Sequence, residues 1–248
     1  MNIVAIIPCR YGSKRFEGKP LMPILGKPMI WWVYSRARKA DILTDVVVAT
    51  DDDKIYKCVK DFGGHVLMTQ PGHRSGTDRA AEAACALNLD GNDIVINIQG
   101  DQPAFDPRCL AEVVNPLLES QQEEMSTLIY KISQKAEISN SNHVKATFDH
   151  NNYALYFSRS TIPYNRDNIV GVEYFKHLGI YAYRKHFLDT FCSLPEGRLE
   201  QTEKLEQLRA LEFGHRIKLV ETLYDSPEVD TPQDIPLLES TSVFSLNT

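Results

Sequence analysis

The sequence predicts an α/β protein with a Rossmann-like, mostly parallel sheet flanked by helices and an inserted antiparallel region. Apolar runs of strand length alternate with amphipathic stretches of helix length over residues 3–98 and again over 199–235, which is the pattern of βαβ units. Between them, residues 125–183 contain several strand-like runs in succession. The 248 residues, 43% hydrophobic and 24% charged, are enough to bury a full core.

The N-terminal part of the chain is expected to supply the parallel strands. The expected strands are residues 3–8, 46–50, 65–68 and 94–98, and the expected helices are residues 29–40, 52–62 and 78–87. Gly63 and Gly64 follow the second helix, where glycine is the preferred terminating residue. Ligands of open α/β sheets bind at the carboxyl ends of strands, so the residues that follow Pro8, Thr50 and Ile98 are the candidates for a site.

The middle of the chain breaks this alternation. The runs STLIYKI, HVKATF, NYALYFS and YFKHLGIYAY indicate antiparallel strands, and no Pro/Gly/Ser-rich linker flanks them. We therefore expect one domain over residues 1–248, with residues 140–190 as an inserted region. The α/β pattern then resumes with a helix over 199–213, a strand over 217–221 and a last helix from Pro232, for which Thr231 is the expected N-cap, Pro232 the first residue and Asp234 the third.

Composition and charge exclude several classes of protein. The formal charge of -6 argues against non-specific binding of nucleic acid. The first apolar run is only one strand long before Pro8, so we expect neither a signal peptide nor a membrane span, and a cytoplasmic protein. The five cysteines show no CxxC pair and no matching histidine spacing, so we expect reduced thiols rather than a zinc site or disulfides.

A basic loop follows the first expected strand. Between Pro8 and Pro20 it contains Arg10, Gly12, Lys14, Arg15, Gly18 and Lys19. Backbone amides and positive charges in such a loop can surround a triphosphate, although a solvated basic turn explains any single cation equally well. The spacing of Gly12 and Gly18 does not fit a Walker A loop, Pro20 stands in place of the magnesium-binding hydroxyl, and the loop lacks the GxGxxG pattern of dinucleotide-binding proteins.

The run IIPCRYGSKRFEGKPL, followed by GKPMI, resembles the N-terminal signature of nucleotide-sugar pyrophosphorylases, and specifically that of the CMP-Kdo synthetases. The resemblance continues in order from Ile3 to about Ile235. It implies a fold of the nucleotide-diphospho-sugar transferase type. It also implies transfer of CMP from CTP to the acid sugar 3-deoxy-manno-octulosonate (Kdo), with Mg²⁺ as cofactor and release of pyrophosphate, to activate the sugar for lipopolysaccharide synthesis. The family is dimeric, which implies a homodimer with residues 140–190 as its sugar-binding and dimerisation region.

The resemblance assigns the catalytic residues. Arg10 and Lys19 match family residues that contact the CTP phosphates, and Arg15 is expected beside the substrate. Asp101 of the GD motif and Asp230 of the VDTP motif match the metal ligands, and Asp101 is counted with the catalytic residues. Two carboxylates near a triphosphate suit Mg²⁺, which prefers oxygen ligands. An aspartate after a strand is also common in turns, so only the two motifs together are specific.

Further substrate contacts are implied by several segments of the chain. The segments ATDD and SGTDR look like the base- and ribose-facing loops of the family, while helix capping by Asp51 or Asp52, and by Thr77 or Asp78, explains them equally well. A sugar carboxylate calls for a forked cation such as Arg159. A structural role of His177 stays open. The implied substrate residues are Arg15, Thr50, Asp51, Ser75, Gly76, Thr77, Gln99, Arg159, His177, Tyr181, Glu206 and Gln207.

One position departs from the commoner family pattern. The chain has GDQP, with Gln102, where GDEP is commoner, and a branch that activates the 8-amino analogue of Kdo also carries Gln there. The analogue is therefore the alternative substrate. Two more distant alternatives are a glycosyltransferase of related fold, which would release no pyrophosphate, and a catalytically silent nucleotide-binding protein.

Overall fold

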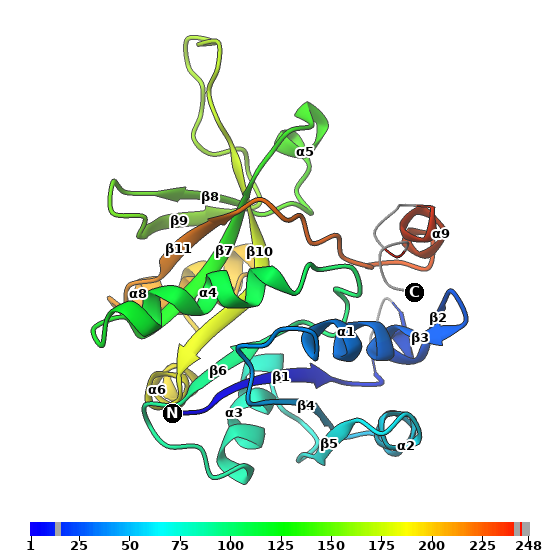
Figure 1. Cartoon of the computed structure of the whole chain (residues 1–248). Helices are drawn as coiled ribbons and strands as arrows, with labels where there is room; N and C mark the ends of the chain where they lie inside the picture. The colour runs from blue at the N-terminus through cyan, green and yellow to red at the C-terminus, as the bar shows by residue number, and fades with distance from the viewer. Residues whose placement is uncertain (13–15, 241–243, 245–248) are drawn as a thin grey trace.

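The central element of the structure, a computed structural model that describes residues 1–12, 16–240 and 244, is a mixed β-sheet (Figure 1). Its strands are β1 (Ile3–Cys9), β4 (Asp45–Thr50), β5 (His65–Met68), β6 (Ile94–Asn97), β7 (Met125–Lys131), β8 (Lys145–Phe148), β9 (Ala154–Ser158), β10 (Phe175–Arg184) and β11 (Lys218–Thr222). Within the described residues, seven of these nine strands follow the order β11-β7-β10-β6-β1-β4-β5, while β8 pairs with β10 and β9 pairs with β8. The short strands β2 (Pro23–Ile24) and β3 (Lys27–Pro28) form a separate hairpin.

The sheet is parallel where the N-terminal strands meet. Strand β1 runs parallel to both β4 and β6, with Ala5 opposite Val46 and Ile96, and β4 runs parallel to β5. Strand β10 is antiparallel to β6 and β7, and its register against β7 shifts between Leu178 and Tyr181. Strand β11 returns parallel to β7. The predicted α/β class, with a mostly parallel sheet and antiparallel strands from the middle of the chain, is confirmed.

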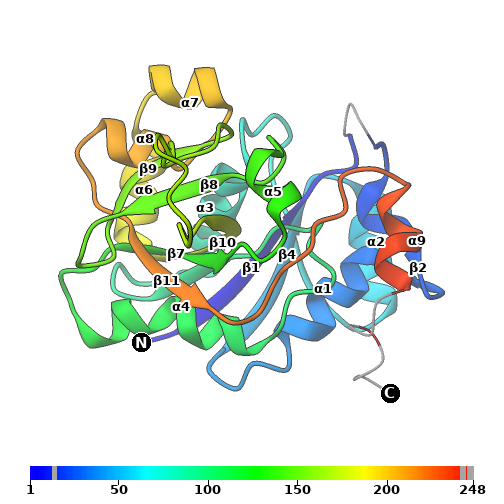
Figure 2. The same cartoon turned by 90° about the horizontal axis from the view of Figure 1, so that it is seen from above.

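Helices cover both faces of the sheet (Figure 2). They are α1 (Met29–Ala37), α2 (Asp53–Asp61), α3 (Gly76–Ala86), α4 (Arg108–Glu119), α5 (Lys135–Ser139), α6 (Lys185–Ser193), α7 (Arg198–Glu203), α8 (Leu208–Glu212), α9 (Asp234–Glu239) and the 3₁₀-helix η1 (Lys19–Leu21). Successive side chains of a strand point to opposite faces. Along β1, therefore, Ile3 and Ile7 pack with α1, α2 and α4, whereas Val4 and Ile6 pack with α3 and α6.

Local capping explains where the helices of the N-terminal part begin. The carboxylate of Asp52 accepts hydrogen bonds from the backbone of Lys54 and Ile55 and so caps α2, as one of the two expected alternatives proposed. The cap of α3 is Ser75, whose hydroxyl accepts from the backbone N–H of Asp78. The expectation that Thr77 or Asp78 caps this helix is wrong, because the helix already begins at Gly76.

Two expectations for the C-terminal part are wrong. A single helix over 199–213 is not formed, since α7 ends at Glu203 and Lys204 adopts the left-handed conformation with φ 55° before α8 begins at Leu208. The last helix begins at Asp234 rather than at Pro232. The carboxylate of Asp234 accepts hydrogen bonds from both the backbone and the hydroxyl of Thr231, so Thr231 is a donor here and not the N-cap.

The segment between β9 and β10 extends away from the sheet, at the top of Figure 1. Three large apolar or aromatic residues in it are mostly exposed: Tyr164 at 82%, Ile169 at 64% and Val170 at 97%. We call residues 159–174 the arm. Across the ranges that the structure describes, none of the helices has both the length and the apolar character needed to cross a bilayer.

Candidate active site

A cleft of about 240 Å³ opens at the carboxyl ends of β1 and β6, where parallel strands place their following loops side by side. It is lined by Pro8, Cys9, Arg10, Lys19, Pro20, His73, Arg74, Ser75, Gly76, Arg79, Gln99, Gly100 and Asp101. Six residues predicted from the sequence lie together in this cleft: Arg10, Lys19, Ser75, Gly76, Gln99 and Asp101. The predicted Arg15 lies outside the described residues.

Glycine allows three chain segments to approach one another here. A Cβ atom at Gly100 would lie 2.7 Å from Sγ of Cys9, and one at Gly76 would lie 3.1 Å from Cγ of Pro8. The loop after β6 and the first turn of α3 therefore close tightly on the end of β1. Gly18, with φ 69°, precedes η1 in the left-handed conformation that glycine adopts most readily, and Lys19 follows it into the cleft.

Positive charge faces one acid in the cleft. Nζ of Lys19 lies 2.7 Å from Oδ2 of Asp101, with the two side chains 13% and 33% exposed. Arg10, Arg74 and Arg79 add three guanidinium groups to the lining, of which Arg74 is paired with Asp78 and Arg79 with Asp51. Charge-assisted hydrogen bonds from such groups are strong and suit phosphate oxygens. The lining of the cleft therefore contains more cationic than anionic side chains, which suits the binding of a polyanion.

A second chain segment brings further acids to Asp101. The backbone N–H of Val229 donates to the carbonyl of Asp101 at 2.9 Å, which places Asp230 beside the loop after β6. Nε2 of Gln102 donates to Oε1 of Glu228 at 3.0 Å. Although part of Glu228 is exposed, its carboxyl group is turned toward Gln102. Burial of that group, followed by the negative charge of Asp101, raises the pKa of Glu228 to about 7.

These acids fit a magnesium site of the open kind. Among the described residues, no group of three or more His, Cys, Asp or Glu side chains is gathered as a metal-binding cluster. Mg²⁺ commonly uses one or two protein carboxylates and takes its remaining oxygens from phosphates and water. Asp101 and Asp230, on two segments joined by the Val229 hydrogen bond, could supply the carboxylate oxygens of such a site.

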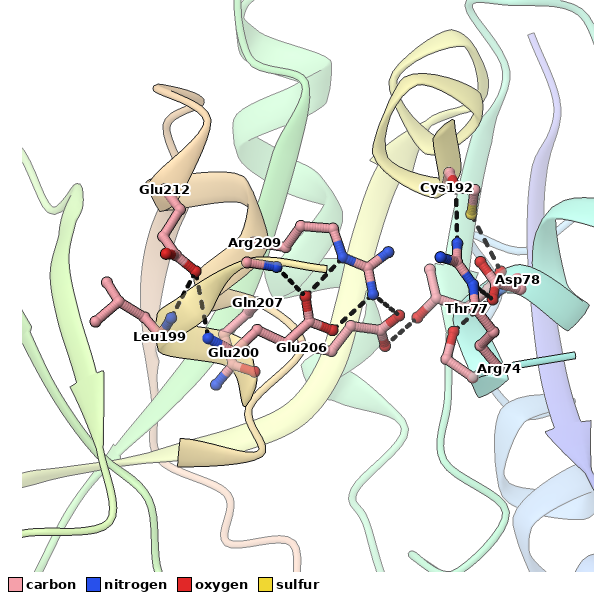
Figure 3. Close-up of polar contacts among 12 residues, drawn as sticks. Arg74, Thr77, Asp78, Cys192, Leu199, Glu200, Glu206, Gln207, Arg209 and Glu212 are labelled. Atoms are coloured by element: carbon pink, nitrogen blue, oxygen red, sulfur yellow. Dashed lines mark hydrogen bonds and ion pairs between the residues drawn. The ribbon is translucent and has the colours of Figure 1, made fainter. Parts of the chain in front are cut away.

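A polar network connects α3 to the break between α7 and α8 (Figure 3). The hydroxyl of Thr77 donates to Oε2 of Glu206 at 2.8 Å, and burial raises the pKa of Glu206. Arg209 donates to both carboxylate oxygens of Glu200, at 2.8 Å and 2.6 Å. Its Nη2 also lies 3.7 Å from Oε1 of Glu206. Because the chain leaves helical geometry at Lys204, Glu206 reaches Thr77 instead of lying on one continuous helix face.

Three of the predicted sugar residues lie together. The hydroxyl of Tyr181 donates to Oε1 of Gln207 at 3.1 Å, and the rings of Tyr181 and His177 are 5.2 Å apart between centroids. Nε2 of His177 lies 3.0 Å from the hydroxyl of Thr127. Burial lowers the pKa of His177 to about 3, so its ring is neutral at physiological pH. His177 therefore makes contacts typical of a structural residue, beside Tyr181, and this is the role that the sequence left open.

Three other predicted residues, Thr50, Asp51 and Arg159, also lie outside the cleft lining, and each makes hydrogen bonds to neighbouring residues. The hydroxyl of Thr50 accepts from the backbone N–H of Asp52 at 3.2 Å. The carboxylate of Asp51 accepts from Arg79 at 2.8 Å and so holds a cleft residue in place. Arg159 donates to the carbonyl groups of Glu203 at 2.8 Å and Ser141 at 3.1 Å. Their roles toward a substrate stay predictions.

Sequence reasoning missed Arg74, Arg79 and Glu228. The two arginines flank the start of α3 in the run HRSGTDR, and a helix N-terminus already favours anions, so this run carried a readable signal. Glu228 carried none, because only the hydrogen bonds of Val229 to Asp101 and of Gln102 to Glu228 reveal where it lies.

The parallel sheet and the basic cleft at its carboxyl edge define a nucleotide-binding α/β enzyme, and comparison with known proteins specifies which. Residues 4–217 match the family model described as cytidylyltransferase. A protein of Syntrophus aciditrophicus (strain SB) named 3-deoxy-manno-octulosonate cytidylyltransferase is 56% identical over 234 residues, which are 94% of each chain. The chain therefore belongs to the cytidylyltransferase family, and the resemblance inferred from the sequence is confirmed.

Two further comparisons bear on the substrate. A protein of Shewanella baltica (strain OS195) named 8-amino-3,8-dideoxy-manno-octulosonate cytidylyltransferase is 55% identical over 236 residues, 95% of this chain and 96% of the relative. The solved structure of a CMP:2-keto-3-deoxy-manno-octonic acid synthetase complexed with CTP has a TM-score of 0.90 and 41% identity, and the match covers 97% of this chain and 98% of that one. Relatives named for two different sugars are thus almost equally similar.

Proposed function

We propose that this cytidylyltransferase transfers CMP from CTP to the anomeric hydroxyl of Kdo and releases pyrophosphate. The observation that carries the proposal is the convergence of Arg10, Lys19 and Asp101 in one cleft at the strand ends. It is supported by the match over nearly the whole chain to a synthetase of this sugar complexed with CTP. The match favours a cytidylyltransferase over the glycosyltransferase and silent-binding alternatives.

The reaction needs positioning and charge more than a nucleophilic side chain. The anomeric oxygen forms a bond to the α-phosphorus while the bond from that phosphorus to the bridging oxygen breaks in line. The electron pair leaves with pyrophosphate, and the hydroxyl proton passes to solvent. Lys19 and Arg10, already in the cleft, are placed to stabilise the negative charge that develops on the leaving group.

Asp101 and Asp230 would hold Mg²⁺. Bound there, the ion would neutralise phosphate charge and make the attacking hydroxyl more acidic. The hydrogen bond from Val229 to Asp101 keeps the two carboxylate-bearing segments together. Lys19 orients the carboxylate of Asp101 through their 2.7 Å contact.

The sugar would lie toward His177, Tyr181, Glu206 and Gln207, with its carboxylate near a cation. A homodimer in the cytoplasm is the proposed form of the enzyme. Tyr164, Ile169 and Val170 on the arm support the dimer, because exposed apolar surface on a protruding segment is typical of a surface that packs against a partner.

The 8-amino analogue of Kdo is a second candidate substrate. The specific observation in its favour is Gln102, whose amide is buried and bound to Glu228 rather than exposed in the turn. The near-equal identity to relatives named for the two sugars leaves both substrates chemically reasonable.

The test is release of pyrophosphate. The chain is incubated with Mg²⁺ and CTP alone, with CTP plus Kdo, and with CTP plus the 8-amino analogue. We expect release only when a sugar is present, with the CMP-sugar as the second product. Release without any sugar, or none with either sugar, would refute the proposal. Substituting ATP, GTP or UTP for CTP checks the identity of the base.

A further inference from the structure

Tyr11 joins the two ends of the basic loop that follows β1. The backbone N–H of Gly18 donates to the carbonyl of Tyr11 at 2.9 Å. Tyr11 is half-buried, and its side chain packs against the hydrophobic cluster that includes residues of α1, α2 and α4. The far end of the loop is therefore attached to a residue that the core already holds in place.

The backbone of Gly18 also lies close against the ring of Tyr11. A Cβ atom at Gly18 would lie 3.2 Å from Cε2 and 3.3 Å from Cζ of that ring, which is closer than most side chains approach their neighbours. A residue without a side chain permits this approach, and the φ of 69° at Gly18 favours the same residue. Gly18 is thus positioned by the ring of Tyr11 as well as by its carbonyl.

Lys54 contacts the same ring from α2. Its Nζ lies 4.3 Å from the centroid of the Tyr11 ring, within the range of a cation–π interaction. Lys54 is the second residue of α2, and its backbone N–H donates to the capping carboxylate of Asp52 at 2.9 Å. The ring of Tyr11 is therefore contacted by the end of the loop and by the ordered first turn of a helix.

Lys19 follows Gly18 directly in the chain. Gly18 is the N-cap of η1, and its carbonyl accepts from the backbone N–H of Leu21 at 2.9 Å. The place of Gly18 thus determines where η1 begins and where the side chain of Lys19 starts toward Asp101, which its Nζ reaches at 2.7 Å. A displacement of Gly18 would displace Lys19 with it.

We propose that Tyr11, supported by Lys54, is a positioning residue that sets the place of Lys19 in the cleft. This inference rests on the proposed function, in which Lys19 stabilises the charge that develops on the leaving pyrophosphate. Tyr11 acts through Lys19 and takes no part in the chemistry. A charge that is already in place stabilises a transition state more effectively than one that must first be ordered.

A purely structural role for Tyr11 is the alternative. Lost packing would lower the stability and the activity whatever residue stands at position 19. A positioning role lowers the activity only while Lys19 is present, because Lys19→Ala leaves no charge to be placed. Substitutions that act through one shared group are not additive, and a double-mutant cycle measures this.

The experiment measures kcat and KM by pyrophosphate release in the full-length chain, with CTP, Mg²⁺ and the sugar that the wild type uses. The variants are Tyr11→Leu, Tyr11→Phe and Lys54→Met, each alone and combined with Lys19→Ala. Tyr56→Leu and Lys60→Met are the matched controls, since Nζ of Lys60 lies 5.7 Å from the ring centroid of Tyr56, both on α2. Thermal unfolding verifies that each variant folds, and Lys54→Met completes the cycle if Tyr11→Leu does not fold.

We expect Tyr11→Leu to lower kcat about tenfold or more, because a small displacement of a catalytic group is costly. The KM for the sugar should stay close to that of the wild type. Tyr11→Phe, which keeps the ring, should retain most of the activity. Lys54→Met should show a smaller loss in the same direction, and in the Lys19→Ala background each substitution should cause little further loss.

Three results would overturn the inference: an unchanged kcat in Tyr11→Leu, losses that multiply with that of Lys19→Ala, or a loss of the same size in Tyr56→Leu. If Tyr11→Leu does not fold, an unchanged kcat in Lys54→Met would do so as well. Absence of turnover by the wild type with either sugar would refute the proposed function itself, which is a distinguishable result.

Discussion

The ammonium group of Lys19 lies 2.7 Å from the carboxylate of Asp101, although 82 positions separate the two residues in the chain. One comes from the basic loop after β1 and the other from the turn after β6. Their contact joins the group expected to hold phosphate to a group expected to hold magnesium. A substitution of either residue therefore removes the ion-pair partner of the other.

Replacement of Lys19 by Ala should remove most of the turnover and leave the fold intact. The loss removes a positive charge from the position where negative charge develops, and losing one such group typically costs about a hundredfold to a thousandfold in kcat. Steady-state pyrophosphate release measures the effect. Lys57→Ala is the control, because Lys57 is an exposed lysine paired with Asp61 on α2. A rate for Lys19→Ala similar to that of the wild type would contradict the assignment.

Turnover should require Mg²⁺, and Asp230 should determine the Mg²⁺ concentration at which the rate is half-maximal. A chelator is expected to abolish turnover, and added Mg²⁺ to restore it. Asp230→Asn should raise the Mg²⁺ concentration for half-maximal rate about tenfold or more, since altered metal sites commonly lose affinity by that factor. Asp41→Asn, at an exposed aspartate, serves as the comparison. Unchanged metal dependence in Asp230→Asn would remove it from the proposed site.

Replacement of Arg209 by Met should destabilise the protein. Arg209 and Glu200 form a two-bond ion pair with side chains 3% and 9% exposed, so the substitution leaves a buried carboxylate without its partner. Breaking such a pair costs about 3–5 kcal/mol in the free energy of unfolding. Urea denaturation measures the change, and the double variant with Glu200→Gln should recover part of it.

An exposed ion pair gives the contrast for that prediction. Lys131 and Glu173 form a pair with side chains 52% and 55% exposed. Lys131→Met should change the free energy of unfolding far less than Arg209→Met does, because an exposed pair is screened by solvent. Equal effects of Lys131→Met and Arg209→Met would mean that burial does not govern the strength of these pairs.

His177 should make the stability depend on pH. Burial lowers its pKa from 6.5 to about 3, so the unfolded chain binds the proton more readily than the folded chain between these values. The free energy of unfolding should therefore fall as the pH falls from about 6.5 toward about 3. In His177→Gln this part of the slope should disappear, whereas His150→Gln, at an exposed histidine, should retain it. Urea unfolding at several pH values measures the slope, and parallel slopes for wild type and His177→Gln would contradict the prediction.

The sequence predicted the parallel half of the fold well because its signals are local. Strands β1, β4, β5 and β6 are short buried runs, and Asp52 and Gly63 mark the two ends of α2. Arg10 and Asp101 lie in the loops that follow such strands, so the geometry of a parallel sheet predicted a site there, and the family resemblance added Lys19 to it.

The failures lie where long-range contacts override local pattern. The run from Leu199 to Phe213 has the apolar spacing of one helix, yet the buried pair of Arg209 with Glu200 and the bond of Glu206 to Thr77 accompany a break at Lys204. Helices α4 and α6 were not anticipated, and α4 contains Pro116, which normally argues against a helix interior. Nothing near Glu228 in sequence indicates its contact with Gln102.

Because Gly100 lies close to Cys9, the residues that can be accommodated at one of these positions depend on the residue at the other. A methyl group at position 100 would lie 2.7 Å from the sulfur, so alanine there requires the Cys9 side chain to move or a smaller residue at position 9. The thiol is buried, and burial raises its pKa, so reagents that attack thiolates should leave it unmodified while the chain is folded. Labelling of Cys9 thus becomes a reporter of opening at the floor of the cleft.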